Sequence, residues 1–279
     1  MTDQNGTYYL VDGSIYIFQS HFSPHVECFD AEGKDLSAVY GFTQFLLQFL
    51  RRVKPDRIAV ALDESLFSGF RHDLCASYKS NRELPDENLA MQLKGCREIC
   101  SILGMASYAS KKYEADDIIG TLSVRMSELL PGDPALCIVT RDKDLAQLLR
   151  TDKDYMWDYS GNRRRYRADI EEEFGVSPEQ FADYLGLVGD AVDCITGVPG
   201  VGPVKAKELL RNFASMDGIY ENLDAVAGLS LRGAAGLALK LEAHQAEARL
   251  SRELATIICD ANDQHEGFAH AVPRSLEVA

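Results

Sequence analysis

Three apolar stretches of the chain share the feature that most constrains its fold, because each of them runs directly into aspartate. "TYYLVD" ends at Asp12, "DRIAVALD" ends at Asp63, and "ALCIVTRDKD" reaches Asp142 and Asp144. Short apolar runs of this kind predict buried strands, and the helical spacing between them, as in residues 36–53, predicts an α/β fold with a parallel sheet. Ligands bind outside the carboxyl ends of such strands, so we expect these acids to meet at one site.

The character of the sequence changes near residue 170. A polar, basic helical region is expected over residues 71–103, whereas from about Glu171 onward the pattern is helical, with Ser177 as an N-cap before Pro178. We therefore expect a catalytic α/β domain over residues 1–170, an all-α domain over residues 171–262 and a loosely held tail over residues 263–279.

Composition and termini indicate the cell compartment. No apolar run approaches the roughly 20 residues of a membrane span, and the N-terminus lacks the basic and apolar regions of a signal peptide. The seven cysteines form neither a CxxC pair nor a zinc pattern, so we expect reduced core thiols. The sequence predicts a cytoplasmic, nucleoid-associated protein that has no membrane partner and acts as a monomer.

Nine acidic side chains fall at strand ends, helix starts or loop edges: Asp12, Asp63, Glu114, Asp116, Asp117, Asp142, Asp144, Asp190 and Asp193. Taken singly, a turn explains Asp12, and capping of a helix start explains Glu114 or Asp116. Capping does not call for so many acids, and their repulsion must be offset by raised pKa values or by bound cations. Oxygen ligands without Cys or His select Mg²⁺ or Mn²⁺, and two such ions support phosphoryl transfer to water.

The net charge of −14 argues against a nucleic-acid partner, but basic residues gather locally. Lys79 and Arg82 are three apart in the expected helical region, suited to gripping phosphates, with Arg71 beside them and Tyr78 free to stack on a base. A solvated basic helix explains this stretch equally well.

The glycine-rich "GVPGVG", residues 197–202, is more distinctive. Gly200 and Gly202 let backbone N–H groups approach phosphates, and Lys205 and Lys207 follow on a helix. A plain turn between two helices explains the glycines but not the lysines.

Taken in order, "LVDGS", "VALD", "YKSNR", "YEADDIIGTL", "IVTRDKDLAQLL" and "FADYLGLVGDAVDCITGVPGVG" resemble the bacterial 5'→3' exonuclease and flap endonuclease family. This family includes the N-terminal nuclease domain of DNA polymerase I and phage 5'-nucleases. The resemblance covers residues 8–260 and implies a PIN-like nuclease domain with a helical arch, followed by a helix-three-turn-helix (helix-hairpin-helix) DNA-binding region.

The resemblance also implies roles for individual residues. A first metal site would use Asp12, Asp63, Glu114, Asp116 and Asp117, and a second Asp142, Asp144, Asp190 and Asp193. Lys79 and Arg82 would lie at the base of the arch beside the scissile phosphate. Backbone carbonyls would hold K⁺, and they belong to Leu187, Val188, Thr196, Val198 and Val201.

We therefore predict a two-metal nuclease acting on DNA with 5' ends, flaps or branches, with Lys79, Arg82 and Asp116 as catalytic residues. A non-catalytic binder of branched DNA and a PIN-type ribonuclease are the alternatives. We also predict that Asp116→Asn or Asp117→Asn raises the stability of the metal-free protein while abolishing cleavage.

Overall fold

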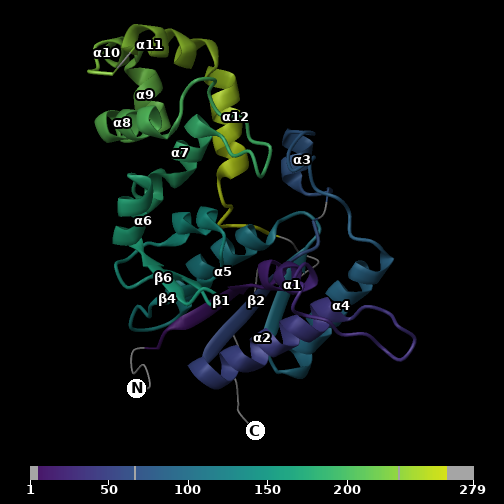
Figure 1. Cartoon of the computed structure of the whole chain (residues 1–279). Helices are drawn as coiled ribbons and strands as arrows, with labels where there is room; N and C mark the ends of the chain where they lie inside the picture. The colour runs from purple at the N-terminus through teal and green to yellow at the C-terminus, as the bar shows by residue number, and fades with distance from the viewer. Residues whose placement is uncertain (1–5, 66, 232, 263–279) are drawn as a thin grey trace.

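A six-stranded sheet forms the base of the molecule (Figure 1). The computed structural model describes residues 6–65, 67–231 and 233–262. The strands are β1 (Tyr8–Asp12), β2 (Arg57–Asp63), β3 (Ala106–Ser110), β4 (Leu136–Val139), β5 (Tyr155–Asp158) and β6 (Arg163–Tyr166). Their order is β3-β2-β1-β4-β5-β6, with β1 to β5 parallel and β6 antiparallel to β5. The predicted parallel sheet is confirmed, with an antiparallel edge strand that the sequence did not indicate.

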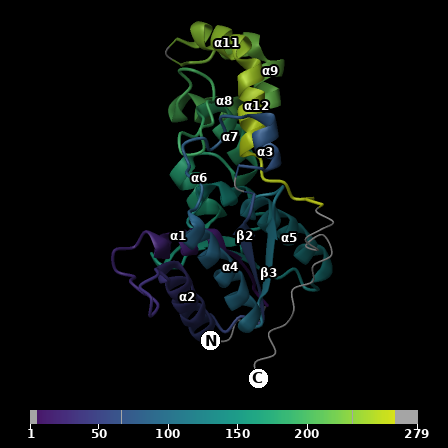
Figure 2. The ribbon, with the colours of Figure 1, turned by 90° about the vertical axis from the view of Figure 1, so that its right-hand side faces the viewer.

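Helices cover both faces of this sheet, as Figures 1 and 2 show. The covering helices are α1 (Gly13–His21), α2 (Ser37–Val53) and α4 (Glu87–Ile102) on one face, and α5 (Ala115–Leu129) with the 3₁₀ helix η1 (Lys143–Leu148) on the other. Successive side chains of a strand point to opposite faces. Tyr9 and Val11 therefore lie in the core beneath α1, α2 and α4, while Tyr8 and Leu10 lie in the core beneath α5 and η1. Both faces of β1 are therefore buried, as its continuous apolar sequence predicts.

The basic region between β2 and β3 differs from the expected continuous helix. It consists of the short α3 (Phe70–Leu74), a run of turns, and α4, which begins after its N-cap Asp86. Lys79 interrupts any helix here because its φ of 50° lies in the left-handed region, and Pro85 follows before α4 starts. The arch residues therefore lie on turns.

Short helices make up the rest of the described chain and stand above the sheet in Figure 1. They are α6 (Arg167–Phe174), η2 (Pro178–Gln180), α7 (Phe181–Val188), α8 (Pro203–Phe213), α9 (Met216–Glu221), α10 (Leu223–Ala227), α11 (Ala234–Ala243) and α12 (Gln245–Ala255). Their apolar side chains continue the core beneath α5, and the all-α character predicted after residue 170 is confirmed. None of the helices in the described ranges has the length and apolarity that crossing a bilayer requires. The predicted tail, residues 263–279, lies outside the described residues.

The segment after α12 returns to the sheet domain and packs along α5. Ala261 N donates to Thr121 Oγ1 at 3.0 Å, and Gln147 Nε2 donates to Ala255 O at 2.9 Å. A Cβ atom at Gly120 would lie 2.9 Å from Ile258 O, so only glycine allows this close approach. Helix α12 itself contacts α3, and Figures 1 and 2 show the two helices near each other. The last described residues thus close over the region where the acids lie.

Candidate active site

Asp12, Asp63 and Asp142 come from three neighbouring strands. Asp12 ends β1 and accepts Ile15 N at 3.4 Å as the N-cap of α1, Asp63 ends β2, and Asp142 follows β4 as the N-cap of η1. Because β1 lies between β2 and β4, the three side chains lie around one end of β1. Burial, and then the charges of Asp63 and Asp142, raise the pKa of Asp12 to about 7. The structure therefore brings these three acids together at the expected edge of the sheet.

Asp116 joins this group from the first turn of α5. Burial raises the pKa of Asp116 well above its ordinary value, and the charges of Asp142 and Asp12 add to the effect. Burial and the charge of Glu114 likewise raise the pKa of Asp63. We call Asp12, Asp63 and Asp116 the uncompensated set, because burial and repulsion outweigh every stabilising contact of their ionised forms.

Glu114 and Asp117 lie in the same short stretch but have cationic partners. Arg71 reaches the two oxygens of the fully buried Asp117 at 2.6 and 2.8 Å. Lys79 Nζ lies 2.9 Å from both oxygens of Glu114, and Tyr78 donates its hydroxyl to Glu114 at 3.0 Å. Burial acts to raise the pKa of Glu114, but the charges of Lys79 and Arg71 prevail and lower it. We call Glu114 and Asp117 the compensated pair.

That Asp117 is a metal ligand stays a prediction, and in this structure its oxygens already have other partners. Besides Arg71, its oxygens accept Glu114 N at 3.1 Å and Ile258 N at 2.9 Å. The carboxylate thus accepts four hydrogen bonds, which occupies its lone pairs. Asp117 also accepts Glu114 N at the start of α5, and asparagine there would leave Arg71 without its counter-charge instead of relieving repulsion.

Arg71 and Tyr78 are buried, so in this structure neither side chain is exposed for the DNA contact that the sequence predicts. Arg71 is only 3% exposed, and its guanidinium also donates to Leu254 O and Thr256 O, each at 2.8 Å. Tyr78 is 2% exposed, and burial raises the pKa of its phenol. Both side chains instead hold the compensated pair in place.

Asp144 and Asp190, two of the acids predicted for a second metal, share the ammonium of Lys143. Lys143 Nζ lies 3.1 Å from Asp144 and 2.5 Å from Asp190. Burial raises the pKa of Asp144 to about 7 with a contribution from Asp142, whereas hydrogen bonding to Lys143 overcomes burial and lowers the pKa of Asp190. Lys143 is not among the predicted site residues, although its place between Asp142 and Asp144 is a signal that it accompanies them.

The turn that carries Lys79 and Arg82 docks on the loop around Asp193. Lys79 N donates to Asp193 O at 3.0 Å, and Asn81 Nδ2 donates to Val192 O at 3.2 Å. Arg82 reaches an Asp193 oxygen at 2.7 Å, while burial raises the pKa of Asp193. Lys79 and Arg82 do not share a helical face as predicted, but their charged groups still converge beside the acids.

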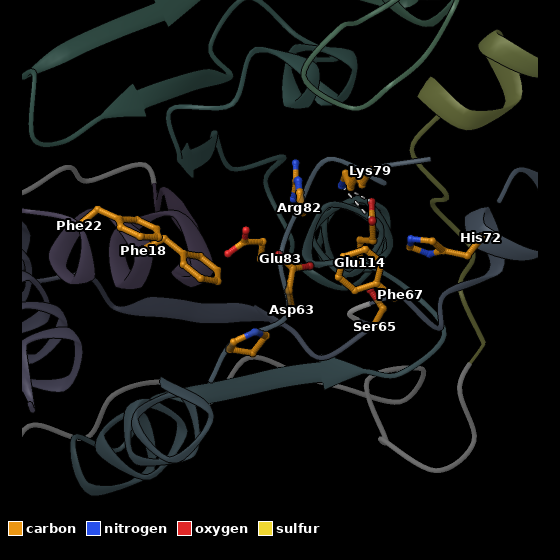
Figure 3. Close-up of a pocket in the computed structure, with 11 residues that line it drawn as sticks. Phe18, Phe22, Asp63, Ser65, Phe67, His72, Lys79, Arg82, Glu83 and Glu114 are labelled. Atoms are coloured by element: carbon orange, nitrogen blue, oxygen red, sulfur yellow. Dashed lines mark hydrogen bonds and ion pairs between the residues drawn. The ribbon is translucent and has the colours of Figure 1, made fainter. Parts of the chain in front are cut away.

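A pocket of about 450 Å³ joins these groups (Figure 3). Asp63 and Glu114 lie at its centre, with Lys79 and Arg82 above them. Aromatic and polar side chains complete the wall, and they are Phe18, Phe22, Ser65, Phe67, His72, Glu83 and Pro85. The aromatic residues are not among the predicted site residues, because a single apolar side chain in a sequence does not show whether it lines a pocket or lies in the core.

The hairpin between α7 and α8 is built largely from its own backbone. Val198 N donates to Leu187 O and Val201 N donates to Val198 O, at 2.8 and 2.9 Å. A Cβ atom at Gly197, whose φ is 65°, would lie 2.4 Å from Gly189 N. Leu187, Val188, Thr196, Val198 and Val201 thus belong to one tight loop, but two of the five predicted K⁺-binding carbonyls already accept hydrogen bonds.

The lysines after this hairpin point in different directions. Lys205 Nζ donates to Gly200 O at 2.8 Å, whereas the Lys207 side chain lies over Gly175, away from the loop. Residues two apart on a helix are separated by about 200°, which explains the split. Lys240 of α11 places its ammonium 2.9 Å from where a Cβ of Gly200 would stand, so it joins Lys205 at the loop in place of Lys207.

The acids fit a hard divalent cation in their chemistry. They offer carboxylate oxygen only, and the uncompensated set keeps a repulsion that a cation would remove. Across residues 6–65, 67–231 and 233–262, no three Asp, Glu, His or Cys side chains are arranged to hold an ion. Arg71, Lys79 and Lys143 pair with the acids instead, so metal binding would require some of these ion pairs to open.

Comparison with known proteins places this site in a family. The family model of the 5'-3' exonuclease N-terminal resolvase-like domain matches residues 7–175, and that of the 5'-3' exonuclease C-terminal SAM fold matches residues 176–271. A 5'-3' exonuclease of Buchnera aphidicola (from Acyrthosiphon pisum) is 31% identical over 92% of this chain and 88% of its own. The chain belongs to the 5'-3' exonuclease family. The predicted enzyme class, a metal-dependent 5'-3' DNA nuclease, is confirmed at the level of this family.

Members of the family also occur inside longer proteins. DNA polymerase I of Pseudomonas aeruginosa is 38% identical over 90% of this chain, but the match spans 27% of the polymerase. Among solved structures, the bacteriophage T5 5'-exonuclease with bound zinc has a TM-score of 0.71 and 20% identity, and the match covers 90% of each chain. A T5 flap endonuclease in complex with DNA and metal ions gives 0.69 at 20% identity, covering 89% of this chain and 88% of that one. These likenesses confirm the PIN-like fold with its helical second domain.

Proposed function

We propose that this member of the family hydrolyses DNA phosphodiesters near 5' ends, flaps or branches, with two divalent ions, Mg²⁺ or Mn²⁺, in its active site. One observation carries the proposal: the cationic side chains of Lys79 and Arg82 line the same pocket as the carboxylates of Asp63 and Glu114. Cations bind a phosphate, and the acids beside them suit the metal ions that its hydrolysis needs.

The acids divide between two ions in the proposed site. Asp12, Asp63, Asp116 and Glu114 would hold the first, and Asp142, Asp144, Asp190 and Asp193 the second, while Asp117 serves only as the anchor of Arg71. When bound, the ions polarise the phosphate and lower the pKa of a water molecule. The uncompensated set supports metal binding here, because burial and neighbouring carboxylates raise the pKa values of its members more than Lys79 lowers those of Asp63 and Asp116.

Lys79 and Arg82 bind and orient the scissile phosphate. In the substrate-free protein Lys79 pairs with Glu114, and Arg82 with Asp193. A substrate phosphate is negatively charged like these carboxylates, so Lys79 and Arg82 can pair with the phosphate instead. Glu114 and Asp193 would then be free to bind metal. Substrate and metal therefore bind with positive cooperativity.

The helical domain binds DNA outside the pocket. Backbone N–H groups at Gly200 and Gly202, with Lys205 and Lys240 beside them, suit the phosphates of a duplex. K⁺ held by the carbonyls of Leu187, Val188, Thr196, Val198 and Val201 would add charge at the same loop. The protein works as a monomer on chromosomal DNA in the cytoplasm, at the nucleoid.

The deciding experiment is hydrolysis of a 5'-flap duplex with and without Mg²⁺, compared with its RNA-flap counterpart. We expect metal-dependent cleavage of the DNA flap, lowered by about 10²-fold or more in Lys79→Met, since a charged contact to the transition state is lost. Lys153→Met is the matched control, because Lys153 pairs with Asp133 on the surface away from the pocket.

The alternatives give different results. Tight binding without cleavage would assign the chain as a non-catalytic binder of branched DNA, and preferential cleavage of the RNA flap would assign it as a ribonuclease. Equal cleavage by Lys79→Met and Lys153→Met would remove the role given to Lys79.

A further inference from the structure

Glu83 lines the active-site pocket but belongs to none of the charge pairs around it. Its neighbour in the chain, Arg82, pairs with Asp193, and Lys79 pairs with Glu114. Glu83 is exposed, and no hydrogen bond or ion pair joins it to another residue of the described ranges. The pocket therefore contains one carboxylate that neither a cationic side chain nor a proposed metal ion compensates.

The carboxylate of Glu83 lies close to the place proposed for the scissile phosphate. Glu83 directly follows Arg82, so the Cα atoms of these two residues are about 3.8 Å apart. Figure 3 shows Glu83 between Phe18 and Asp63, in the open middle of the pocket. The apolar rings of Phe18 and Phe22 on one side leave less water to screen its charge. Glu83 thus adds a negative charge beside a cation that would bind phosphate.

The charge of a DNA strand next to the scissile phosphate depends on the kind of 5' end. One nucleoside separates this position from the scissile phosphate, and the pocket volume of about 450 Å³ has room for an object of nucleotide size. A flap has a phosphodiester at this position, with one negative charge. A phosphorylated nick has a terminal phosphate monoester, with a charge of about −1.5 to −2 at pH 7, and an unphosphorylated end has no charge. The three kinds of end therefore present different charges to Glu83.

We propose that Glu83 selects against a 5'-terminal phosphate beside the cleaved bond, so that flaps and unphosphorylated 5' ends are removed in preference to phosphorylated nicks. This inference rests on the proposed nuclease function and adds a determinant of specificity to it. Lys79 and Arg82 attract every phosphate, whereas an unpaired carboxylate repels a terminal phosphate more than a diester, because the monoester has the greater charge. A nick with a 5'-phosphate is the end that strand joining requires, and the enzyme would leave it intact.

The test uses three nicked duplexes of one sequence, whose 5' end at the nick carries a hydroxyl, a methyl phosphate diester or a phosphate. We measure kcat/KM with Mg²⁺ for each and divide the values for the two charged ends by that for the hydroxyl end. Glu83→Gln should raise the ratio for the phosphate end about fivefold, because one repelling charge is removed at short range. The ratio for the methyl ester should rise by a smaller factor. Glu83→Asp keeps the charge and should keep both ratios close to those of the unaltered protein.

The matched control is Glu87→Gln, which removes an exposed acid in the first turn of α4, outside the pocket, and should leave both ratios unchanged. Unchanged ratios in Glu83→Gln, or an equal change of kcat/KM for all three ends, would overturn the inference while the nuclease function stands. Absence of cleavage of every nick and of the 5'-flap duplex by the unaltered protein would instead refute the proposed function itself.

Discussion

Glu114 of the compensated pair and Asp116 of the uncompensated set are carboxylates two residues apart, yet their pKa values move in opposite directions. The pKa of Glu114 falls because Lys79 and Arg71 outweigh the effect of burial, whereas burial raises the pKa of Asp116 and its mainly acidic neighbours raise it further. Burial acts in the same sense on both. The difference therefore comes from which side chains the chain places beside each acid.

This contrast separates acids that pair with a cationic side chain of the protein from acids whose mutual repulsion a bound cation would relieve. Asp117 and Arg71 satisfy each other, so the folded protein leaves neither of these buried charges unpaired. The uncompensated set is destabilising in the absence of a ligand. Counting acids in a sequence cannot make this distinction, and three substitutions can break or sharpen it.

The largest effect is expected for Asp116→Asn. Removing one charge of the uncompensated set should lower the rate of flap cleavage by about 10³-fold or more, because a metal ligand is lost, and leave the metal-free stability equal or higher. Flap cleavage with Mg²⁺ and urea unfolding in EDTA measure the two quantities. Asp56→Asn is the control, since Asp56 is exposed and precedes β2 at the end opposite Asp63. A destabilised Asp116→Asn protein would place Asp116 with the compensated pair.

A smaller but still large effect is expected for Asp117→Ala. The substitution strands the buried guanidinium of Arg71, so the free energy of unfolding should fall by about 3–5 kcal/mol. Urea unfolding in EDTA measures it. The double variant Arg71→Met with Asp117→Leu should recover part of the loss, because it leaves neither charge unpaired. A loss below about 1 kcal/mol for Asp117→Ala would contradict the anchoring role.

The smallest effect concerns the pH dependence of stability. The pKa of Asp12 is about 7 in the folded protein against an ordinary 3.8, so the folded state binds the extra proton and the free energy of unfolding falls as pH rises from about 4 to 7. The total fall should be about 2–4 kcal/mol. Asp12→Asn should flatten this slope, and Mg²⁺ should stabilise the unaltered protein at pH 8 more than the variant. Identical slopes in urea unfolding with EDTA would show that Asp12 is compensated.

The parts of the fold that follow from local pattern were predictable. The ends of β1 and β2 at Asp12 and Asp63 match the sequence expectation, because apolar runs and helical spacing are local signals. The roles of Arg71 and Tyr78 were not predictable. The partners of Arg71 are Asp117 and Thr256, 46 and 185 residues away, so its sequence neighbourhood looks the same whether it binds DNA or is buried.

The site was predictable as a set of residues but not as an arrangement. Spacing alone placed Lys79 and Arg82 on a helical face, whereas the left-handed conformation of Lys79 and the docking on Asp193 put them on a turn. Glu83 likewise enters the pocket through the fold of this turn, and nothing in its sequence neighbourhood separates it from an exposed surface acid.

Arg71 is hydrogen-bonded by the end of α12 and the segment that follows it, and this has a consequence for synthesis on the ribosome. The guanidinium donates to Leu254 O and Thr256 O, and Asp117 accepts from Ile258 N. The last parallel strand, β5, ends at Asp158, so about 100 residues separate it from these partners. At roughly 5–20 residues per second, the sheet emerges about 5–20 s before the groups that complete its buried ion pair. The nascent nuclease domain therefore passes through a period in which Arg71 and Asp117 lack part of their hydrogen bonding.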